Sequence, residues 1–477
     1  MRYRKPRTSG AIVINQAHPQ PGAEQIARNR SAFGAVLVHS ISIIIPAYNS
    51  GGQLTECLQA IRDSSFLPLE TIVVDDSSTD DTRRRAVDDA TQVLDSGGRR
   101  GPGFARNLGA KQASGDILFF IDSDVCVWKD TIERIAHHFD SDPTLDAVIG
   151  SYDRSPRCWD FLSQYRNLMH AYVHQNGEAH ASTFWTGCGA VRRSVFVEHG
   201  GFDESRPRPA IEDIELGYRM RLNGRNLLLD RNLLVTHLKR WSFWSMIKTD
   251  IVDRGIPWTE LILSSRFMPN DLNLRLSQRI SVLVAFLLAA VTGILVAQDG
   301  GHMLIPLLAI ALLMLAGWWT EIRNLVRPLQ ALILLSCFVA VLAQQTLSHH
   351  MYLLFLALLL SPAFLLLMRP SYRRDTTPAW SYFLCALYIV GSLGIAVVTL
   401  PARPLLLLWF VLIVVLCLLN AKFYLFIKQE RRIVFMMAVI PLHFLHHFYN
   451  GISFVIGLTR YCLAFLRRCV PRFRAAS

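Results

Sequence analysis

GDILFFIDSDVCVW, residues 115–128, joins an apolar run to two acidic residues. The run from Ile117 to Ile121 is typical of a strand that is buried on both faces of a largely parallel sheet. Asp122 and Asp124 follow it, and side chains two positions apart on a strand point the same way. At the carboxyl end of the strand, two such carboxylates repel each other unless a cation lies between them. The alternative is an Asp-Ser-Asp turn whose side chains bond the local backbone.

Two earlier segments repeat this pattern of an apolar strand followed by polar residues. Residues 41–45 (ISIII) and 71–74 (TIVV) predict buried strands, and residues 53–63 predict a helix between them. Strands that alternate with helices predict an α/β fold with an open, mostly parallel sheet, whose ligand binds at the carboxyl ends of the strands. The polar groups that follow the three strands are Tyr48 and Asn49, Asp75 and Asp76, and Asp122 and Asp124.

Two common nucleotide-binding patterns are missing from these turns. No G-x-G-x-x-G fingerprint follows the first strand and no G-x-x-x-x-G-K-[ST] occurs anywhere, which argues against a dinucleotide enzyme and a P-loop NTPase. The turn after the second strand instead reads Ser77, Ser78, Thr79, and these residues are expected to cap a helix that begins near Asp80.

The composition changes sharply near residue 280. The chain has 477 residues and 51% hydrophobic residues, and it is mixed and charged only up to about residue 278. The remainder predicts an all-α transmembrane domain, because six apolar runs each approach the length that crosses a bilayer. The alternative is a buried helical bundle. The predicted spans are 280–297, 303–320, 329–345, 350–368, 381–400 and 404–420.

The charges of the connecting loops predict the topology of this domain. The basic loops are 321–328, 369–379 and 421–432, and positive loops stay in the cytoplasm. The large amino-terminal domain is therefore expected in the cytoplasm, with the chain in the cell inner membrane as a multi-pass protein. Basic residues that flank the membrane account for the net charge of +12, so no nucleic-acid partner is needed to explain it.

The carboxyl-terminal segment is harder to interpret. Residues 433–457 are apolar but include Pro441 and His443, and a basic tail follows them. A crossing would put this tail outside, so a re-entrant or surface-lying segment is expected. The expected organisation is 1–40, a basic flexible segment; 41–240, the α/β domain; 241–279, an interfacial amphipathic linker; 280–420, about six transmembrane helices; and 421–477, a basic loop, the re-entrant or interfacial segment and the tail.

Six motifs in order resemble the inverting glycosyltransferases of family 2, which have the GT-A fold. They are SIIIPAYN, IVVDDSSTDDT, GPGFARNLGA, GDILFFIDSD, GGFDE and IEDIELGYRM, within residues 41–240. The resemblance implies a nucleotide-sugar donor, usually a uridine diphosphate sugar. It places Asp122 on the sugar diphosphate. It places seven further residues around the nucleotide: Pro46, Tyr48, Asn49, Asp75, Asp76, Arg106 and Asn107.

The same resemblance implies a divalent metal and a catalytic base. Asp122 and Asp124 would hold Mg²⁺ or Mn²⁺ on the diphosphate, and His237 matches a position where relatives place a further ligand. These metals prefer oxygen ligands and bind through one or two carboxylates plus phosphate oxygens. Asp213 would be the base, with Glu212 as the alternative; otherwise both acids merely complement the dipole of the helix that they begin.

The acceptor is expected at the membrane. Residues 238–262 contain Trp241, Trp244, Ile247 and Ile251 at helical spacing, which suits a helix at the bilayer interface. A polyprenyl phosphate or another lipid-linked acceptor would fit there. A processive polysaccharide synthase is the main alternative, although its Q-x-x-R-W motif has His237 in place of glutamine here. A transporter or scaffold with a degenerate transferase domain is a third, but the six spans lack Asp, Glu, Lys and Arg.

Overall fold

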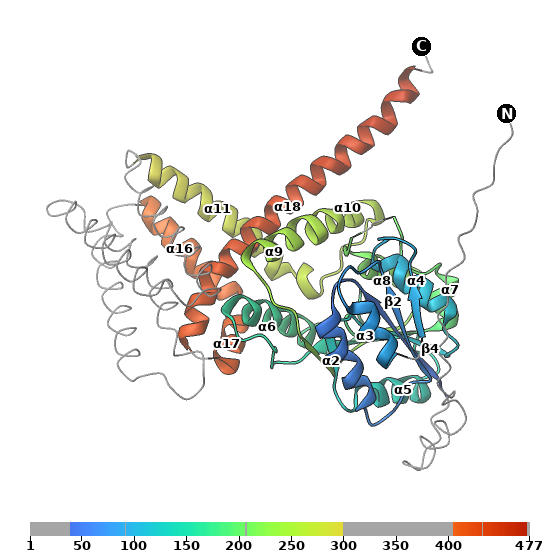
Figure 1. Ribbon diagram of the computed structural model, residues 1–477. Helices are drawn as coiled ribbons and strands as arrows, with labels where there is room; N and C mark the ends of the chain where they lie inside the picture. Colours follow the sequence, from blue (N-terminus) through green and yellow to red (C-terminus); the bar gives the residue numbers. More distant parts are fainter. Residues whose placement is uncertain (1–38, 91, 206–207, 299–403, 432, 475–477) are drawn as a thin grey trace. The chain divides into compact units, whose positions relative to one another are not determined.

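A computed structural model describes residues 39–90, 92–205, 208–298, 404–431 and 433–474. The described chain forms two compact units. The first holds the residues up to Leu274 together with the segment from Ile456, and the second holds Arg275–Val455. Figure 1 shows the sheet and its helices in the first unit, and long helices in the second.

The first unit is built on an eight-stranded mixed sheet in the order β3-β2-β1-β4-β7-β6-β8-β5. Parallel pairing joins β3, β2, β1 and β4, and also β6 and β8, whereas β4–β7, β7–β6 and β8–β5 are antiparallel. The predicted α/β class is therefore confirmed, with the parallel part at one end of the sheet. The strands are β1 Ile41–Ala47, β2 Glu70–Asp75, β3 Gln92–Asp95, β4 Ile117–Phe120, β5 Val125–Val127, β6 Ala147–Tyr152, β7 Gly189–Arg192 and β8 Leu227–His237.

Helices cover both faces of this sheet. Successive residues of β1 and β4 contribute to opposite hydrophobic clusters: Ile43 and Phe119 to one, Ile44 and Phe120 to the other. The side-chain period of two explains this division, and it is why these strands are apolar throughout. The helices of the domain are α2 Gly51–Arg62, α3 Thr82–Asp89, α4 Pro102–Gln112, α5 Thr131–Ser141, α6 Phe161–Gln175, α7 Arg193–Glu198 and α8 Glu212–Leu222.

The expected capping of α3 is wrong. The residue before its first turn is Asp81, and no side chain caps the helix there. Ser78 Oγ instead accepts a hydrogen bond from the Asn49 backbone N–H, and the Thr79 N–H donates to Asn49 Oδ1. Ser78 and Thr79 are thus bonded to the turn after β1, whereas Asp80 of the same turn accepts a hydrogen bond from the N–H of Thr82, the first residue of α3, at 3.0 Å.

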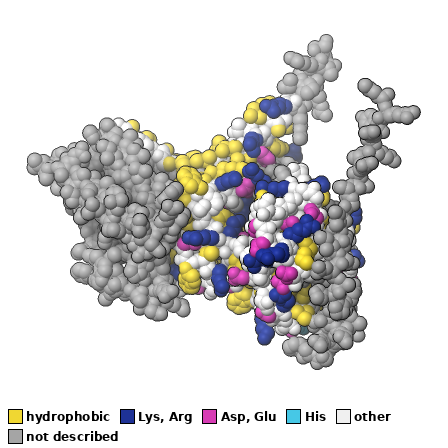
Figure 2. All heavy atoms as spheres, in the orientation of Figure 1, with side chains coloured by type: hydrophobic (Ala, Val, Ile, Leu, Met, Phe, Trp, Pro, Cys, Tyr) yellow, Lys and Arg dark blue, Asp and Glu magenta, His cyan; other side chains and the backbone are white. Residues whose placement is uncertain are grey.

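A helical segment follows β8 within the first unit. It comprises α9 (Phe243–Lys248), a π-helical stretch at Thr249–Gly255 and α10 (Ile256–Ser265). Only part of the predicted apolar stripe is accessible: Trp241 is buried, because it packs near the Arg166 guanidinium, whereas Trp244 is 67% exposed. On the face in Figure 2, charged side chains of both signs lie interspersed over the sheet domain, and hydrophobic side chains form larger areas over the helices that follow it.

The described residues include two candidate membrane spans, of which the second extends past the unit boundary at Ile456. The first is α11 (Leu276–Gln298), and the second is Phe435–Arg467 within α18 (Ile433–Arg474). Two further helices, α16 (Pro404–Leu419) and α17 (Ala421–Glu430), form a bent pair, which is a third candidate span if the pair is taken as one. The predicted spans 280–297 and 404–420 coincide with α11 and α16. The predictions at 303–320, 329–345, 350–368 and 381–400, and most of segment 1–40, lie outside the described residues.

Residues 433–457, expected to form a re-entrant or surface-lying segment, lie within α18, which continues through them without a break. Their position relative to a membrane stays a prediction. The polar side chains of this segment find partners without unwinding the helix. His443 Nδ1 lies 3.1 Å from the Tyr424 hydroxyl, and Asn450 lies within hydrogen-bond distance of His446, one turn away. A helical backbone satisfies its own polar groups, so an apolar segment with a few bonded polar side chains continues as a helix.

Candidate active site

The turns after β1 and β2 form one side of the candidate site. Asn49 has a positive φ of 48°, which asparagine tolerates in tight turns. Its side chain bonds the backbone of Thr79, so it holds the two turns together. Tyr48 is partly exposed, and the Arg99 guanidinium lies 4.1 Å from its ring centre. Pro46 lies within β1 and is half-buried. Arg99 thus covers one face of the Tyr48 ring at the strand end, while 37% of the residue stays exposed.

Asp75 and Asp76 are both buried and bonded to backbone groups. Asp75 accepts a hydrogen bond from the Ser78 N–H at 3.2 Å. Asp76 accepts from the N–H groups of Arg100 and Gly101 at 2.8 and 2.9 Å, just before α4 begins. Asp76 thus fixes the loop that leads into α4, whatever else it binds.

Arg106 on α4 is the charged centre of the site. Its guanidinium donates to Asp122 Oδ1 at 2.7 Å and to Glu212 Oε1 at 2.8 Å. Burial would lower the pKa of Arg106, but the charges of Asp122, Glu212 and Asp213 outweigh it and raise that pKa. This one buried cation joins the end of β4 to the first turn of α8, which the sequence separates by 90 residues or so.

Asn107, the next residue on α4, serves a different purpose. Its amide nitrogen donates to the Phe202 carbonyl at 2.9 Å and to Glu204, and its oxygen accepts from the Phe202 N–H at 2.9 Å. The side chain is therefore engaged with the loop that precedes α8. Among the described residues, Asn107 positions this loop, and its predicted place beside the nucleotide remains a proposal.

Asp122 and Asp124 lie close enough for their charges to interact. Burial raises the pKa of Asp122, the Arg106 charge opposes this, and the Asp124 charge adds to it. Burial also acts to raise the pKa of Asp124, but the charge and hydrogen bond of His237 outweigh it and lower that pKa. His237 Nε2 lies 3.5 Å from Asp124 Oδ2. Asp122 thus faces Arg106, and Asp124 faces His237.

Asn167 on α6 orients His237. Its side-chain oxygen lies 2.6 Å from His237 Nδ1, and the Tyr152 ring stacks on the imidazole at 4.4 Å. A hydrogen bond at Nδ1 leaves Nε2 to face Asp124. Within the part of the chain that the structure describes, no three His, Cys, Asp or Glu side chains converge enough to hold a metal. Asp122, Asp124 and His237 therefore lie near one another, but their side chains do not converge on one point as metal ligands.

The first turn of α8 carries two acids in contrasting surroundings. Both oxygens of Glu212 are engaged, one by Arg106 and the other by the Ala210 N–H at 2.9 Å. Asp213 is bonded to the N–H and hydroxyl of Thr186, each at 3.2 Å. Burial, reinforced by the Glu212 charge, raises the pKa of Asp213 to about 6. A carboxylate with a pKa near neutrality suits proton transfer better than one that is paired with arginine.

The predictions for α8 agree with its geometry. The helix begins at Glu212, ends at Leu222 and is followed by Asn223 and by Gly224 at φ +74°. The sequence analysis did not identify Asn167 or Thr186. Asn167 lies inside a helix and carries no strand-end signal. Thr186 precedes β7, and only the folded chain brings it to Asp213.

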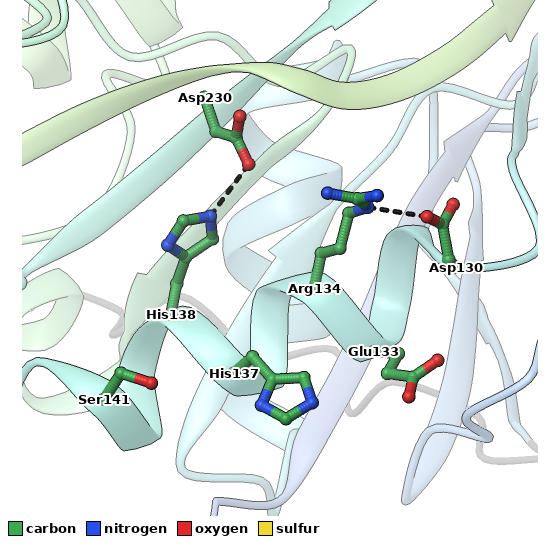
Figure 3. Close-up of a pocket in the computed structure, with 7 residues that line it drawn as sticks. All are labelled: Asp130, Glu133, Arg134, His137, His138, Ser141 and Asp230. Atoms are coloured by element: carbon green, nitrogen blue, oxygen red, sulfur yellow. Dashed lines mark hydrogen bonds and ion pairs between the residues drawn. The ribbon is translucent and has the colours of Figure 1, made fainter.

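A cavity lies elsewhere on the domain, away from the candidate site. It has a volume of about 520 Å³, lies between α5 and β8 and contains none of the predicted site residues. Figure 3 shows two pairs among its lining side chains, His138 with Asp230 at 2.8 Å and Arg134 with Asp130 at 2.6 Å. Glu133 accepts a hydrogen bond from the Ser65 hydroxyl at 2.7 Å. Such pairs stabilise the packing of α5 on β8 and leave little free charge for a ligand.

Residues 42–200 match the family described as Glycosyl transferase family 2. Glycosyltransferase GlyG of Streptococcus pneumoniae serotype 4 is 32% identical over 117 residues, which cover 24% of this chain and 38% of that protein. The pre-mycofactocin glycosyltransferase of Mycobacterium tuberculosis is 27% identical over 232 residues, 46% of this chain and 45% of that protein. The matched region thus spans less than half the length of these relatives.

Solved structures with similarity to this chain overlap it only partly. A mannosyltransferase from Pyrobaculum calidifontis, solved with GDP-Man and Mn²⁺, is 22% identical, covers 48% of this chain and 63% of its own, and has a TM-score of 0.36. TarS residues 1–349 of S. aureus, solved with UDP-GlcNAc, are 21% identical with a TM-score of 0.35, covering 47% and 66%. These scores are too low to transfer any detail to this chain.

Proposed function

We propose that this protein is a membrane-bound inverting glycosyltransferase. It would move a hexosyl group from a nucleotide-diphosphate sugar, expected to be a UDP-sugar, to a lipid-linked or polyprenyl-phosphate acceptor at the cytoplasmic face of the inner membrane. The family match over residues 42–200 supports the reaction class. The observation that carries the proposal most is the buried Arg106, which bonds Asp122 and Glu212 at once. It brings the strand-end acids and the first turn of α8 into one site.

In the proposed reaction with a hydroxyl acceptor, Asp213 takes the proton of the hydroxyl, whereas an ionised phosphate acceptor would attack through its oxygen with no proton for the base to take. The hydroxyl oxygen bonds to the anomeric carbon while the bond from that carbon to the diphosphate breaks on the opposite face. The proton ends on Asp213 and the electron pair leaves with the nucleotide diphosphate. One carboxylate base and no covalent intermediate invert the anomeric centre. A pKa of about 6 leaves Asp213 mostly ionised at neutral pH and able to accept a proton.

Thr186 and Arg106 would hold this base ready. Thr186 bonds one oxygen of Asp213 and the Ile214 N–H bonds the other at 2.8 Å, which fixes the plane of the carboxylate. Arg106 neutralises the neighbouring Glu212, so the two acids can lie side by side on one helical turn.

The residues at the end of β4 suit a divalent cation. Asp122 and Asp124 repel each other, and carboxylate oxygens are the ligands that Mg²⁺ and Mn²⁺ prefer. Asp122 and Asp124 would hold the metal together with diphosphate oxygens, and His237 would approach it from β8. When bound, the metal supplies positive charge that stabilises the departing diphosphate. Asn167 would keep the His237 ring turned toward this point.

The nucleotide would lie against the turns after β1 and β2. Tyr48 offers an aromatic face, and the backbone of Pro46 and Asn49 would border the base. Asp75 and Asp76 would face the ribose, while their bonds to Ser78, Arg100 and Gly101 keep the loops in place. Asn107 would act indirectly, through the loop at Phe202.

The test uses membranes that contain the full chain. They are incubated with Mn²⁺ and a panel of labelled nucleotide sugars, including UDP-glucose, UDP-N-acetylglucosamine and GDP-mannose, and the lipid extract is counted. Label from one donor in the lipid extract, lost in the Asp213→Asn variant, is the expected result. No incorporation and no nucleotide binding from any donor would overturn the proposal. A ladder of products, rather than one added sugar, would favour the processive synthase.

A further inference from the structure

A groove of about 420 Å³ opens beside the first turn of α8. Glu212 and Glu215 of α8 line it, together with Glu260 and Leu261 of α10 and the side chains of Tyr461 and Phe465 from α18. These segments all belong to the first compact unit, because its boundary lies at Ile456. The groove reaches Glu212, whose sequence neighbour is the base Asp213.

Direct contacts hold the wall of this groove that α10 provides. Trp258 Nε1 donates to the Tyr218 hydroxyl at 3.0 Å, which joins α10 to α8. Tyr218 itself is buried. The position of Glu260 and Leu261 is therefore tied to the same helix that carries Asp213.

The side of the groove that α18 provides is held by close packing at Gly457. Gly457 of α18 is buried, and a Cβ atom added there would lie 2.7 Å from Thr259 Cβ and 3.0 Å from the Ile256 carbonyl oxygen of α10. Contacts that short do not occur between real side chains, so the approach of these two segments requires glycine. Tyr461 and Phe465 lie one and two turns farther along α18, over the groove.

The chemistry of the groove disfavours an anion. Its lining has four acids, the three named glutamates and Asp203, and one basic residue, Arg460. Arg106 and Arg219 pair with Glu212 and Glu215 from outside the lining, which reduces the excess of negative charge but does not reverse it. A phosphate group placed there would face net repulsion. Carboxylate oxygens accept strong hydrogen bonds from hydroxyl groups, and aromatic faces with a few directed polar groups are typical of sites for neutral ligands.

We infer that this groove binds the acceptor, and that the acceptor presents a neutral, hydroxyl-bearing group there, a saccharide or polyol, rather than a phosphate. The carboxylates would accept its hydroxyl hydrogens, and the rings of Tyr461 and Phe465 would cover its apolar face. Asp213 follows Glu212 on the first turn of α8 but is not part of the groove lining, so the reacting hydroxyl would have to extend past Glu212 to reach it. The inference rests on the proposed function, and it adds the carboxyl-terminal part of α18 to the acceptor site.

The test compares two acceptors on the full chain in nanodiscs. Octyl β-D-glucoside supplies neutral hydroxyls, and phytanyl phosphate supplies a phosphate on a lipid tail. The donor is each labelled nucleotide sugar of the panel above. The expected result is transfer to octyl β-D-glucoside at a higher kcat/KM than to phytanyl phosphate. Tyr461→Ala and Phe465→Ala should each raise the KM for the glucoside about tenfold, and UDP binding checks that each variant is folded.

Leu463→Ala is the matched control, because Leu463 lies on the same segment, is 51% exposed and is not part of the groove lining. It should keep the wild-type KM. Preference for phytanyl phosphate, or an unchanged KM in both aromatic variants, would overturn the inference while leaving the proposed function intact. Absence of donor binding and transfer in the wild-type chain would instead overturn the proposed function itself.

Discussion

The acids after the strands and the acids of α8 are the same residue types in opposite situations. Asp76 is bonded by two backbone N–H groups, and Asp122 is paired with Arg106. On α8, Glu212 shares that arginine, but Asp213 has no cation within bonding distance among the described residues, and burial raises its pKa to about 6. The surroundings therefore distinguish Asp213, which lacks a cationic partner among the described residues, from carboxylates that backbone N–H groups or Arg106 hold.

The sharpest way to break this comparison is Asp213→Asn. The substitution keeps the size of the side chain but removes its basicity, and a positioned base contributes about 10²–10⁴-fold to a rate. We expect a loss of transfer of that order with UDP affinity within about threefold of wild type. The measurement is single-turnover transfer of labelled sugar, with UDP binding on the same preparation.

Asp130→Asn is the matched control for this substitution. Asp130 lies at the start of α5, far from α8 in sequence, and its partner Arg134 is an exposed neighbour on the same helix. It should transfer at the wild-type rate. If Asp213→Asn keeps near-wild-type turnover, Asp213 is not the base, and the comparison between the two sets of acids fails.

The second prediction concerns Arg106→Met, which removes the shared cation. Breaking a buried ion pair leaves an uncompensated charge, which typically lowers the free energy of unfolding by about 3–5 kcal/mol. We expect a decrease of about 3 kcal/mol here, because 34% of the Asp122 side chain is exposed. Arg134→Met removes an exposed pair and should cost about 0.5 kcal/mol or less. Chemical denaturation of the two variants compares them. Equal losses would show that Arg106 does not hold the two regions together.

Asn167→Ala tests the support of the metal site. Groups that orient a metal-ligating histidine contribute about 10–100-fold to metal affinity or activity. We therefore expect the Mn²⁺ concentration for half-maximal transfer to rise by that order, with the rate at saturating Mn²⁺ less affected. The opposite pattern, a lower maximal rate at unchanged Mn²⁺ dependence, would mean that Asn167 supports the fold rather than the metal.

The pH dependence gives the smallest expected effect. Only the ionised form of Asp213 accepts a proton, so the rate is lost as pH falls through its pKa of about 6. At pH 5 roughly one-tenth of the group is ionised, and transfer at saturating donor should be about tenfold below its plateau above pH 7. UDP binding across the same range separates this effect from donor affinity. A rate that stays flat down to pH 5 would contradict the raised pKa.

The sequence predicted three strands of the sheet, β1, β2 and β4, because these are almost wholly buried and read as apolar runs. Ile117–Phe120 and Ile41–Ala47 form at the expected places, and Leu54, Cys57, Leu58 and Ile61 form the buried face of α2. The sequence predicted less about the pairing of side chains. Thr186 meets Asp213 only through the fold, and the serines after β2 bond the preceding turn instead of capping α3.

The carboxyl-terminal helix was predicted less completely. Its histidines, Asn450 and Pro441 led to the prediction of a re-entrant or surface-lying segment, and the structure shows an unbroken helix whose polar side chains have partners within it and on α17. The sequence pattern of α18 therefore gave its apolar character but not its length. Nor could that pattern indicate that Gly457 allows the helix to pack closely on α10, because this contact joins segments far apart in the chain.

The configuration of the newly formed glycosidic bond tests the central claim most directly. If one carboxylate base on α8 drives a direct displacement, an α-linked UDP-sugar must give a β-linked product. Nuclear magnetic resonance of the purified product, made by the full chain from the donor that the panel identifies, determines this linkage. A β anomer is the predicted result, and an α anomer would contradict the account.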